Sequence, residues 1–311
     1  MVRKGEWQPG DLGVYFPPDT LLPTKWTDEF GVTKYCQPQP GDKQRIRCAK
    51  LRGEPSFGLL MPAARYADGI PVDYDVAARF GVEKYYPPVR TTAGDAEADH
   101  PLFVKYTEIE NLRNYPDVFL PDEYVIITEK LDGTNCRVGV IEGQAMAGSH
   151  RLRRKHPATP EAMSANTYWF PWTLPSVLGL LNDLAREHQQ VILFGEVYGP
   201  GIQKNPIKVK QLSFRAFDLL VDDRYLDYPK FLETCAQYEI SVVPVLSSCG
   251  YSLEQVRSLA SGATYTGQGK REGVVVHPVA ERVDPRIGRV ALKYINDEVL
   301  LDLQREDTTD I

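Results

Sequence analysis

A single lysine lies in an alternating apolar stretch with acids close to it on both sides. The stretch VIITEKLDGTNCRVGV, residues 125–140, carries Glu129, Lys130 and Asp132, followed by Gly133 and Asn135. A lysine amine is a nucleophile only in its neutral form, and its usual pKa of about 10.4 leaves well under about 1% neutral at pH 7. Lowering that pKa to roughly 7–8 requires burial or cationic neighbours, worth on the order of 4 kcal/mol. The end of a buried strand would supply the burial.

The neighbouring carboxylates alone would have the opposite effect, because they stabilise the ammonium form. They are compatible with a nucleophile only if they face a metal or a substrate. A lysine at a strand end is more often a surface cation, and this interpretation of Lys130 stays open while the motif is considered alone. Gly133 would permit a tight turn or a close approach of the backbone to a phosphate. Asn135 adds a neutral hydrogen-bond donor.

Four further motifs follow this one in the order of a known family. The KLDGTN segment resembles the K-x-D-G-x-N signature of ATP-dependent RNA ligases, which belong to the covalent nucleotidyltransferases together with DNA ligases and mRNA capping enzymes. The later motifs are similar to the third, aromatic, fourth and fifth motifs of that family: ILFGEVYG with Glu196, FRAFDLL with Phe217, EGVVV with Glu272 and ALKY with Lys293. A lone K-x-D-G match would be a weak signal, whereas the ordered set predicts an enzyme of this family.

The resemblance implies a role for each of the central residues. Lys130 would attack the α-phosphorus of ATP, forming a lysyl-AMP phosphoramidate and releasing pyrophosphate. Asp132 and Glu272, as hard oxygen donors, would hold a hydrated Mg²⁺, for which Mn²⁺ would substitute. That metal would also neutralise the acids around the lysine. Glu196 would bind the ribose hydroxyls, and Phe217 would stack on adenine.

Other residues complete the nucleotide site that the resemblance implies. Glu129 would take part in adenine recognition, partly through its backbone, and Lys293 would contact the α-phosphate. Arg151, in GSHRLRRK, occupies the place of a family arginine for ribose or phosphate. Its neighbour His150 is interpreted as a bystander. Asn135 would act mainly when AMP is transferred to a 5′-phosphate end.

The chain is expected to contain two domains. Residues 1–86 read as short strands broken by Pro and Gly, and they resemble the OB-type domain that precedes the catalytic domain in the Deinococcus-type branch. Residues 87–101, PPVRTTAGDAEADHP, have the composition of a linker. Residues 102–311 would form the adenylyltransferase domain. The expected fold class is α+β: an ATP-grasp-like ligase domain of antiparallel sheets with flanking helices, preceded by an all-β OB-like domain.

Periodicity predicts the elements of the catalytic part. Apolar residues at helical spacing predict three helices, over residues 176–190, 228–240 and 252–262. Segments rich in Val, Ile and aromatic residues predict four strands, over residues 191–199, 214–221, 271–278 and 289–295. The third helix would begin with a capping box of Ser252 and Gln255 and end at Gly262. A final helix is expected after Ile295.

Composition and charge indicate the cellular compartment that is expected for this chain. The chain has 311 residues, a net charge of −6 and five cysteines without a C-x-x-C pair, which favours a reduced, cytoplasmic protein. No apolar run is long enough for a membrane span, and MVRKGEWQPG has no signal-peptide core. Basic residues cluster at 43–52, 151–155 and 204–210, so local basic surfaces are compatible with the acidic whole. Each such cluster is by default a solvated face.

The ordered motifs predict an ATP-dependent RNA ligase, with no obligate protein partner evident. The family resemblance implies a role in RNA repair and a substrate of nicked duplex RNA or an RNA/DNA hybrid in which the strand with the 3′-OH is RNA. The alternatives are an ATP-dependent DNA ligase, a GTP-using capping enzyme and a non-catalytic RNA-binding protein on a ligase scaffold. Asn135 in place of an arginine at the end of the signature favours RNA. Many relatives carry a second lysine where this chain has Ala291, so either Lys293 alone suffices or the contact with the α-phosphate is weakened.

Overall fold

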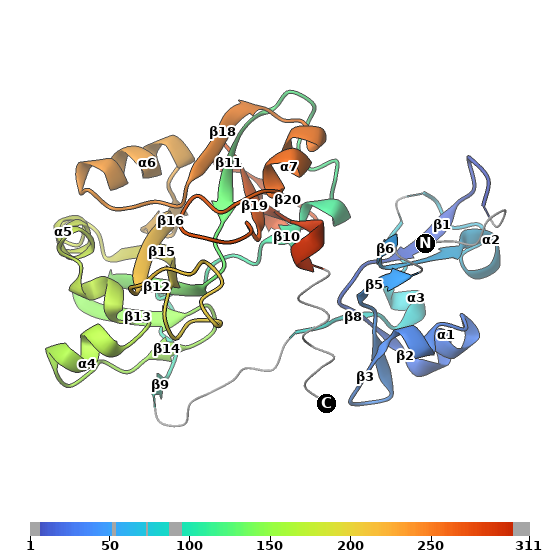
Figure 1. Cartoon of the computed structure of the whole chain (residues 1–311), viewed down its shortest axis with the longest axis horizontal. Helices are drawn as coiled ribbons and strands as arrows, with labels where there is room; N and C mark the ends of the chain where they lie inside the picture. Colours follow the sequence, from blue (N-terminus) through green and yellow to red (C-terminus); the bar gives the residue numbers. More distant parts are fainter. Residues whose placement is uncertain (1–6, 52–53, 73, 87–94, 301–311) are drawn as a thin grey trace. The chain divides into compact units, whose positions relative to one another are not determined.

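The computed structural model describes residues 7–51, 54–72, 74–86 and 95–300 (Figure 1). By internal contacts the chain divides into two compact units, Met1–Pro88 with Asp297–Ile311, and Val89–Asn296. Residues 87–94 of the expected linker lie outside the described residues. The rest of that segment is not a simple tether, because β9 (Ala96–Glu97) pairs with β14 (Arg153–Arg154). The domain boundaries drawn from composition stay a prediction.

The N-terminal unit consists of short strands with small helices among them. Its strands are β1 (Gly13–Phe16), β2 (Thr20–Pro23), β3 (Gln37–Gln39), β4 (Lys43–Arg45), β5 (Cys48–Leu51), β6 (Glu54–Phe57), β7 (Leu59–Pro62) and β8 (Glu83–Lys84). Its helices are α1 (Thr24–Glu29), η1 (Thr33–Tyr35), α2 (Ala63–Tyr66) and α3 (Ala77–Phe80). One sheet has the order β3-β4-β2-β8, while β1 pairs with β7 and β5 with β6. Pro23 and Pro62 end strands and cap α1 and α2, because proline cannot donate to a strand ladder but fits a helix start.

The catalytic unit is built on two sheets that are antiparallel except where β10 joins β22. The five-stranded sheet has the order β10 (Glu110–Asn111), β22 (Leu292–Ile295), β19 (Gly273–Pro278), β11 (Tyr124–Lys130) and β18 (Val245–Gly250). The seven-stranded sheet has the order β17 (Arg224–Tyr225), β16 (Ser213–Val221), β15 (Gln190–Tyr198), β12 (Thr134–Ile141), β13 (Gln144–Ser149), β14 and β9. Figure 1 shows both sheets side by side, with helices on their outer faces. The expected fold class, a mixed unit of antiparallel sheets and flanking helices after an OB-like domain, is confirmed.

Helices cover the two sheets through separate hydrophobic cores. α5 (Pro175–Leu184) and α6 (Tyr228–Gln237) pack with the seven-stranded sheet, whereas α7 (Leu253–Ala260) packs on the five-stranded one. The remaining short elements are η2 (Leu112–Asn114), α4 (Pro160–Ala165), η3 (Phe170–Thr173), β20 (Val283–Asp284) and β21 (Gly288–Arg289). Within the described ranges, no helix combines the length and apolar character needed to cross a membrane.

The four expected strands and three expected helices of this unit are confirmed, but some ends differ. The first helix stops at Leu184 rather than reaching 190, because Gln190 is already the first residue of β15. Ser252 is the N-cap of α7, yet its side chain makes no capping hydrogen bond, so the expected capping box is wrong. The Gln255 amide is engaged elsewhere, donating to Ser247 Oγ at 3.2 Å. The last residue of α7 is Ala260, and its C-cap is Ser261 rather than the expected Gly262.

The expected helix after Ile295 begins at residues 297–300 and runs to the edge of the described chain. Its continuation over residues 301–311 lies outside the described residues. The structure therefore confirms the start of that helix and leaves its length a prediction.

A buried arginine links the β20–β21 hairpin to the seven-stranded sheet. The Arg289 side chain is 8% exposed and forms ion pairs with Asp218 of β16 at 2.7 Å and with Glu281 at 2.6 Å. It also donates to the Tyr106 hydroxyl at 3.2 Å and lies 3.7 Å from the centre of the Tyr225 ring. Asp218 is 1% exposed, so its charge depends on this partner. A buried carboxylate that loses its partner is strongly destabilising.

We expect Arg289→Met to lower the free energy of unfolding by about 3 kcal/mol or more, since Asp218 and Glu281 would lose their partner. Urea denaturation followed by circular dichroism measures this change. Arg286→Met is the matched control, because Arg286 pairs with Asp117 and Asp284 at an exposed site where ion pairs contribute little. Equal midpoints for the two variants would show that the buried ion pairs of Arg289 do not stabilise the fold.

Candidate active site

The signature segment passes from one sheet to the other. β11 ends at Lys130 in the five-stranded sheet, and β12 begins at Thr134 in the seven-stranded sheet. Lys130 is paired in register with Gly273 of β19, next to Glu272. Asn135 is paired with Glu196 of β15. The residues 131–133 therefore carry the chain across the junction, and acids from distant motifs meet beside the lysine.

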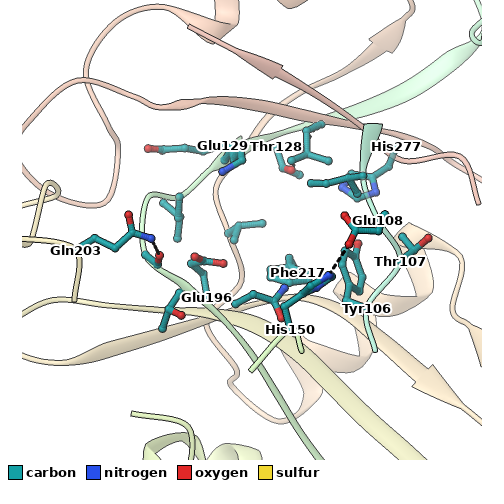
Figure 2. Close-up of a pocket in the computed structure, with 18 residues that line it drawn as sticks. Tyr106, Thr107, Glu108, Thr128, Glu129, His150, Glu196, Gln203, Phe217 and His277 are labelled. Atoms are coloured by element: carbon teal, nitrogen blue, oxygen red, sulfur yellow. Dashed lines mark hydrogen bonds and ion pairs between the residues drawn. The ribbon is translucent and has the colours of Figure 1, made fainter. Parts of the chain in front are cut away.

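Gly133 is required at this crossing by packing. A Cβ at Gly133 would lie 2.5 Å from the Val197 carbonyl oxygen and 3.0 Å from Glu196 Cγ, both on β15. The Gly133 carbonyl accepts a hydrogen bond from the Gln203 side chain (Figure 2). The close approach of β15 thus explains why a glycine is needed at position 133. The sequence alone had suggested a tight turn or a close approach to a phosphate.

Lys130 is held by the carboxylate of the fourth motif. Its Nζ lies 2.6 Å from both Glu272 Oε1 and Oε2, and the two side chains are 24% and 13% exposed. Burial by itself lowers the pKa of Lys130, but the charges of Glu272, Glu196 and Asp132 oppose it, and the net pKa is raised. Without a ligand the lysine is therefore an ammonium ion and not a nucleophile.

The pKa values of the other two carboxyl groups, Asp132 and Glu196, are also shifted by this arrangement. Burial, together with the charge of Glu272, raises the pKa of Asp132 to about 6, and Lys130 only partly offsets that rise. Burial raises the pKa of Glu196 to about 8, against the attraction of Lys130. Three acids thus share one cation, and the site favours a further positive charge.

The donor set fits a hard cation that keeps most of its water. Among the described residues, no group of three or more His, Cys, Asp or Glu side chains is arranged to enclose a metal. Mg²⁺ commonly binds through one or two carboxylates and completes its shell with water and substrate phosphates. Asp132 and Glu272 supply two such carboxylates. A cation bound there would also weaken the attraction by which the carboxylates stabilise the protonated form of Lys130.

A cavity of about 320 Å³ opens beside Lys130 and is of a size that takes a small ligand. Figure 2 shows Thr128 and Glu129 on one side of this space and Glu196 and Phe217 on the other. The lining residues come from the segment before β11, from β11 and the signature, from β15, β16 and β19, and from three loops. They are Tyr106, Thr107, Glu108, Ile109, Thr128, Glu129, Lys130, Leu131, Gly133, Thr134, Asn135, His150, Glu196, Gln203, Phe217, Val243, Val275 and His277. An aromatic ring and apolar side chains near carboxyl groups suit a nucleoside.

Several lining residues were missed or discounted in the sequence. His150, interpreted there as a bystander, lines the cavity, and its ring nitrogen lies 3.0 Å from Glu108 Oε1. His277 is 2% exposed, and its Nδ1 has no hydrogen-bond partner among the described residues. Burial and the charge of Arg289 lower the pKa of His277 to about 3, so the ring is neutral at physiological pH. His277 lies five residues after Glu272, but nothing in the sequence itself marked it as a residue of the cavity.

Glu129, Arg151 and Lys293 were expected in the site, but their side chains have surroundings different from those of the other site residues. The Glu129 side chain is 2% exposed and its carboxylate accepts hydrogen bonds from the Thr264 hydroxyl and, at 3.0 Å, from the Tyr265 amide. Arg151 is not among the described residues that line the cavity. Lys293 is also not a lining residue, but it is the register partner of Val275, so its side chain shares that face of the sheet.

The raised pKa of Glu196 predicts a pH-dependent cost to stability. Because the folded pKa of about 8 exceeds the unfolded value of about 4.3, this contribution is most favourable at low pH and is lost as pH rises through 8. Glu196→Gln mimics the neutral acid at every pH. We expect Glu196→Gln to stabilise the protein more at pH 9 than at pH 5, by at least about 1 kcal/mol, or roughly 2–4 °C in Tm.

Thermal melts of both proteins at the two pH values check this expectation. Glu233→Gln serves as the control, since Glu233 is exposed on α6 and pairs only with Lys230 among the described charges. A Tm difference for Glu196→Gln that does not change between pH 5 and pH 9 would contradict the buried-acid account.

Comparisons with known proteins agree with this geometry. A model described as RNA ligase matches residues 123–295, and one described as an OB-fold domain matches residues 1–63. The structure of Naegleria gruberi RNA ligase with PPi is 26% identical with a TM-score of 0.76, covering 98% of this chain and 90% of its own. A mutant of that ligase with ATP and Mn is 25% identical with a TM-score of 0.76, covering 96% and 89%. A search of curated proteins found no match. Since the RNA ligase model spans more than half of the sequence, the chain belongs to the RNA ligase family.

Proposed function

We propose that this chain is an ATP-dependent RNA ligase that works through a lysyl-AMP intermediate. The observation that carries the proposal is Lys130, held 2.6 Å from Glu272 at the edge of a nucleoside-sized cavity, within a chain of the RNA ligase family. The use of ATP and a divalent metal is supported by the related Naegleria ligase, whose mutants have been solved with ATP and Mn and with AMP and Mn.

The first step forms a bond between Lys130 Nζ and the α-phosphorus of ATP. The ammonium must first lose a proton, after which the amine attacks and the bond to the pyrophosphate oxygen breaks. A bound Mg²⁺ or Mn²⁺ supplies charge neutralisation and polarises the phosphate. We assign the holding of that ion to Asp132 and Glu272, in keeping with their carboxylate chemistry. Lys293 shares a strand face with the cavity wall and would offset charge on the α-phosphate.

The nucleoside part of ATP would lie in the cavity. Phe217 presents an aromatic ring for adenine, and Glu196 presents a carboxyl for the ribose hydroxyls. The buried Glu129 would act through its backbone, since its carboxylate is already bonded to the loop at Thr264 and Tyr265. Arg151 stays assigned to ribose or phosphate by resemblance alone.

Two further steps complete the reaction. An oxygen of a 5′-phosphate end attacks the phosphorus of lysyl-AMP, which releases Lys130 and forms a 5′–5′ pyrophosphate link to AMP. The adjacent 3′-OH then attacks the 5′-phosphate, forming the phosphodiester and releasing AMP. Asn135, in register with Glu196, would orient the AMP during these transfers.

We also propose the finer features of the substrate and setting. The chain would seal nicks in duplex RNA or RNA/DNA hybrids whose 3′-OH strand is RNA, as in the Deinococcus-type branch, and would act in RNA repair in the cytoplasm without an obligate partner. A-form duplexes expose 2′-hydroxyls in a wide minor groove, which gives a protein a means of sensing RNA at the nick.

Label transfer from ATP radiolabelled at the α-phosphate tests the lysyl-AMP intermediate. With Mg²⁺, we expect label on the wild-type band of a denaturing gel and none on Lys130→Ala, because only the amine forms the phosphoramidate. Lys105→Ala, at an exposed lysine paired with Asp99, should be labelled as the wild type is. Absence of label on the wild type with ATP, GTP and NAD would favour a non-catalytic RNA-binding protein.

Sealing of four nicked duplexes separates RNA from DNA ligation. The strands on either side of the nick are varied independently between RNA and DNA, and the ligated product is quantified. We expect a ribonucleotide at the 3′-OH end to be required, with a loss of at least about 10-fold when it is DNA, equal to about 1.4 kcal/mol. Equal sealing of an all-DNA nick would support the DNA ligase alternative instead.

A further inference from the structure

Two loops of the catalytic unit interlock to form one surface, which we call the loop platform. It consists of residues 200–212, between β15 and β16, and residues 261–271, between α7 and β19. The Gln268 amide donates to the Ile207 carbonyl at 2.8 Å. Gly267 and Gly269 are packed so closely that a Cβ would lie 2.3 Å from the Ile207 and 2.8 Å from the Pro206 carbonyl oxygen. The two loops are therefore held against each other as a unit.

The loop platform is tied on both sides to the segment that carries the nucleophile. Gln203 donates to the Gly133 carbonyl, three residues after Lys130 (Figure 2). From the second loop, the Thr264 hydroxyl and the Tyr265 amide donate to the Glu129 carboxylate, directly before Lys130. A ligand bound on the platform is thus positioned relative to the reacting lysine.

The exposed groups of the loop platform are basic and aromatic. Residues 200–212 and 261–271 contain no Asp or Glu, although the whole chain has a net charge of −6. The acid that follows the second range, Glu272, is paired with Lys130. Four lysines, all of them exposed, are distributed over the two loops: Lys204, Lys208, Lys210 and Lys270. The Tyr265 side chain is 72% exposed. Lysines around an exposed aromatic ring fit a polynucleotide, whose phosphates bind cations and whose bases stack.

We propose that the loop platform binds the phosphodiester backbone of the RNA substrate beside the nick, with Tyr265 stacking on a base. This inference rests on the ligase function proposed above. Phosphate chemistry is shared with the triphosphate of ATP, but neither Tyr265 nor any of the four lysines lines the cavity. Their spread over an exposed surface fits a long anion better than a compact one. The basic cluster at 204–210, by default a solvated face, thereby receives a function.

The test compares two variants of the platform with a matched control. Lys208→Glu/Lys210→Glu reverses two platform charges, and Tyr265→Ala removes the ring while keeping the backbone amide that holds Glu129. Lys155→Glu/Lys230→Glu makes the same charge change at exposed lysines outside the platform. Two quantities are measured for each protein. They are lysyl-AMP formation from ATP alone, and the Kd for nicked duplex RNA with a 5′-phosphate over a series of salt concentrations without ATP.

We expect lysyl-AMP formation within about 2-fold of wild type in every variant. The platform charge reversal should raise the Kd by at least about 10-fold and reduce the slope of log Kd against log salt by about 1–2, as for one or two lost phosphate contacts. Tyr265→Ala should raise the Kd by about 5-fold or more, in keeping with the loss of one stacked base. The control should bind RNA within about 2-fold of wild type.

Other outcomes overturn specific statements. If the wild type forms lysyl-AMP and seals nicks while the platform variants bind RNA as the control does, the platform is not an RNA site and the ligase function stands. If lysyl-AMP formation falls together with RNA binding, the lysines serve the triphosphate and the RNA assignment is wrong. If the wild type forms no lysyl-AMP, the proposed function fails, and the inference that rests on it fails too.

Discussion

The ion pair between Lys130 and Glu272 is the interaction on which the rest of the site depends. A partly buried amine would lose its proton readily in an apolar wall, but here three carboxylates surround it and raise its pKa. The resting chain therefore holds the lysine unreactive. Reactivity requires that the acids find another positive charge, and the proposed metal and substrate would bring one. In the proposed mechanism, the acids next to the lysine would prevent attack until a nucleotide and a cation have both bound.

This arrangement exists only because two sheets meet at the signature. Lys130 ends a strand of one sheet, Glu196 belongs to a strand of the other, and the chain crosses between them at Gly133. Burying these acids beside one another at a junction costs stability, as the raised pKa values of Asp132 and Glu196 indicate. Buried ion pairs such as Arg289 with Asp218 stabilise the fold elsewhere in the same unit. The site thus depends on structural contacts that have no chemical role.

The surroundings of Lys130 separate two kinds of recognition. On one side lies an enclosed space with Phe217, His277 and carboxyls, suited to a nucleoside. On the other side lies the exposed, acid-free loop platform, suited to a phosphodiester backbone. Lys130 lines the enclosed space, and the loop platform is hydrogen-bonded to Glu129 and Gly133. The nucleotide and the polynucleotide can therefore be brought to the same atom in successive steps. Proximity of this kind accounts for a large share of the rate gain in two-substrate reactions.

The sequence alone determined the family, the fold class and the types of the main elements. These follow from local patterns: the KLDGTN segment and its ordered partners, apolar spacing in the helices, and Val-rich strands such as 271–278. Local patterns also placed Glu196 and Phe217 on strands that line the cavity, and Glu272 in the strand segment 271–278, whereas β19 begins one residue after Glu272. The roles of these residues remain proposals, because their chemistry is not visible in the resting structure.

Only the tertiary structure decided which strands are neighbours and which polar groups become buried. Lys130 and Glu272 are 142 residues apart, and nothing in either segment specifies a 2.6 Å contact. His277, a pocket residue with a strongly lowered pKa, and His150, paired with Glu108, had no local signal. The capping box at Ser252 failed because Gln255 found a partner on β18. Periodicity tells which face of an element is buried, whereas pairing and pKa depend on what packs against that face from elsewhere in the chain.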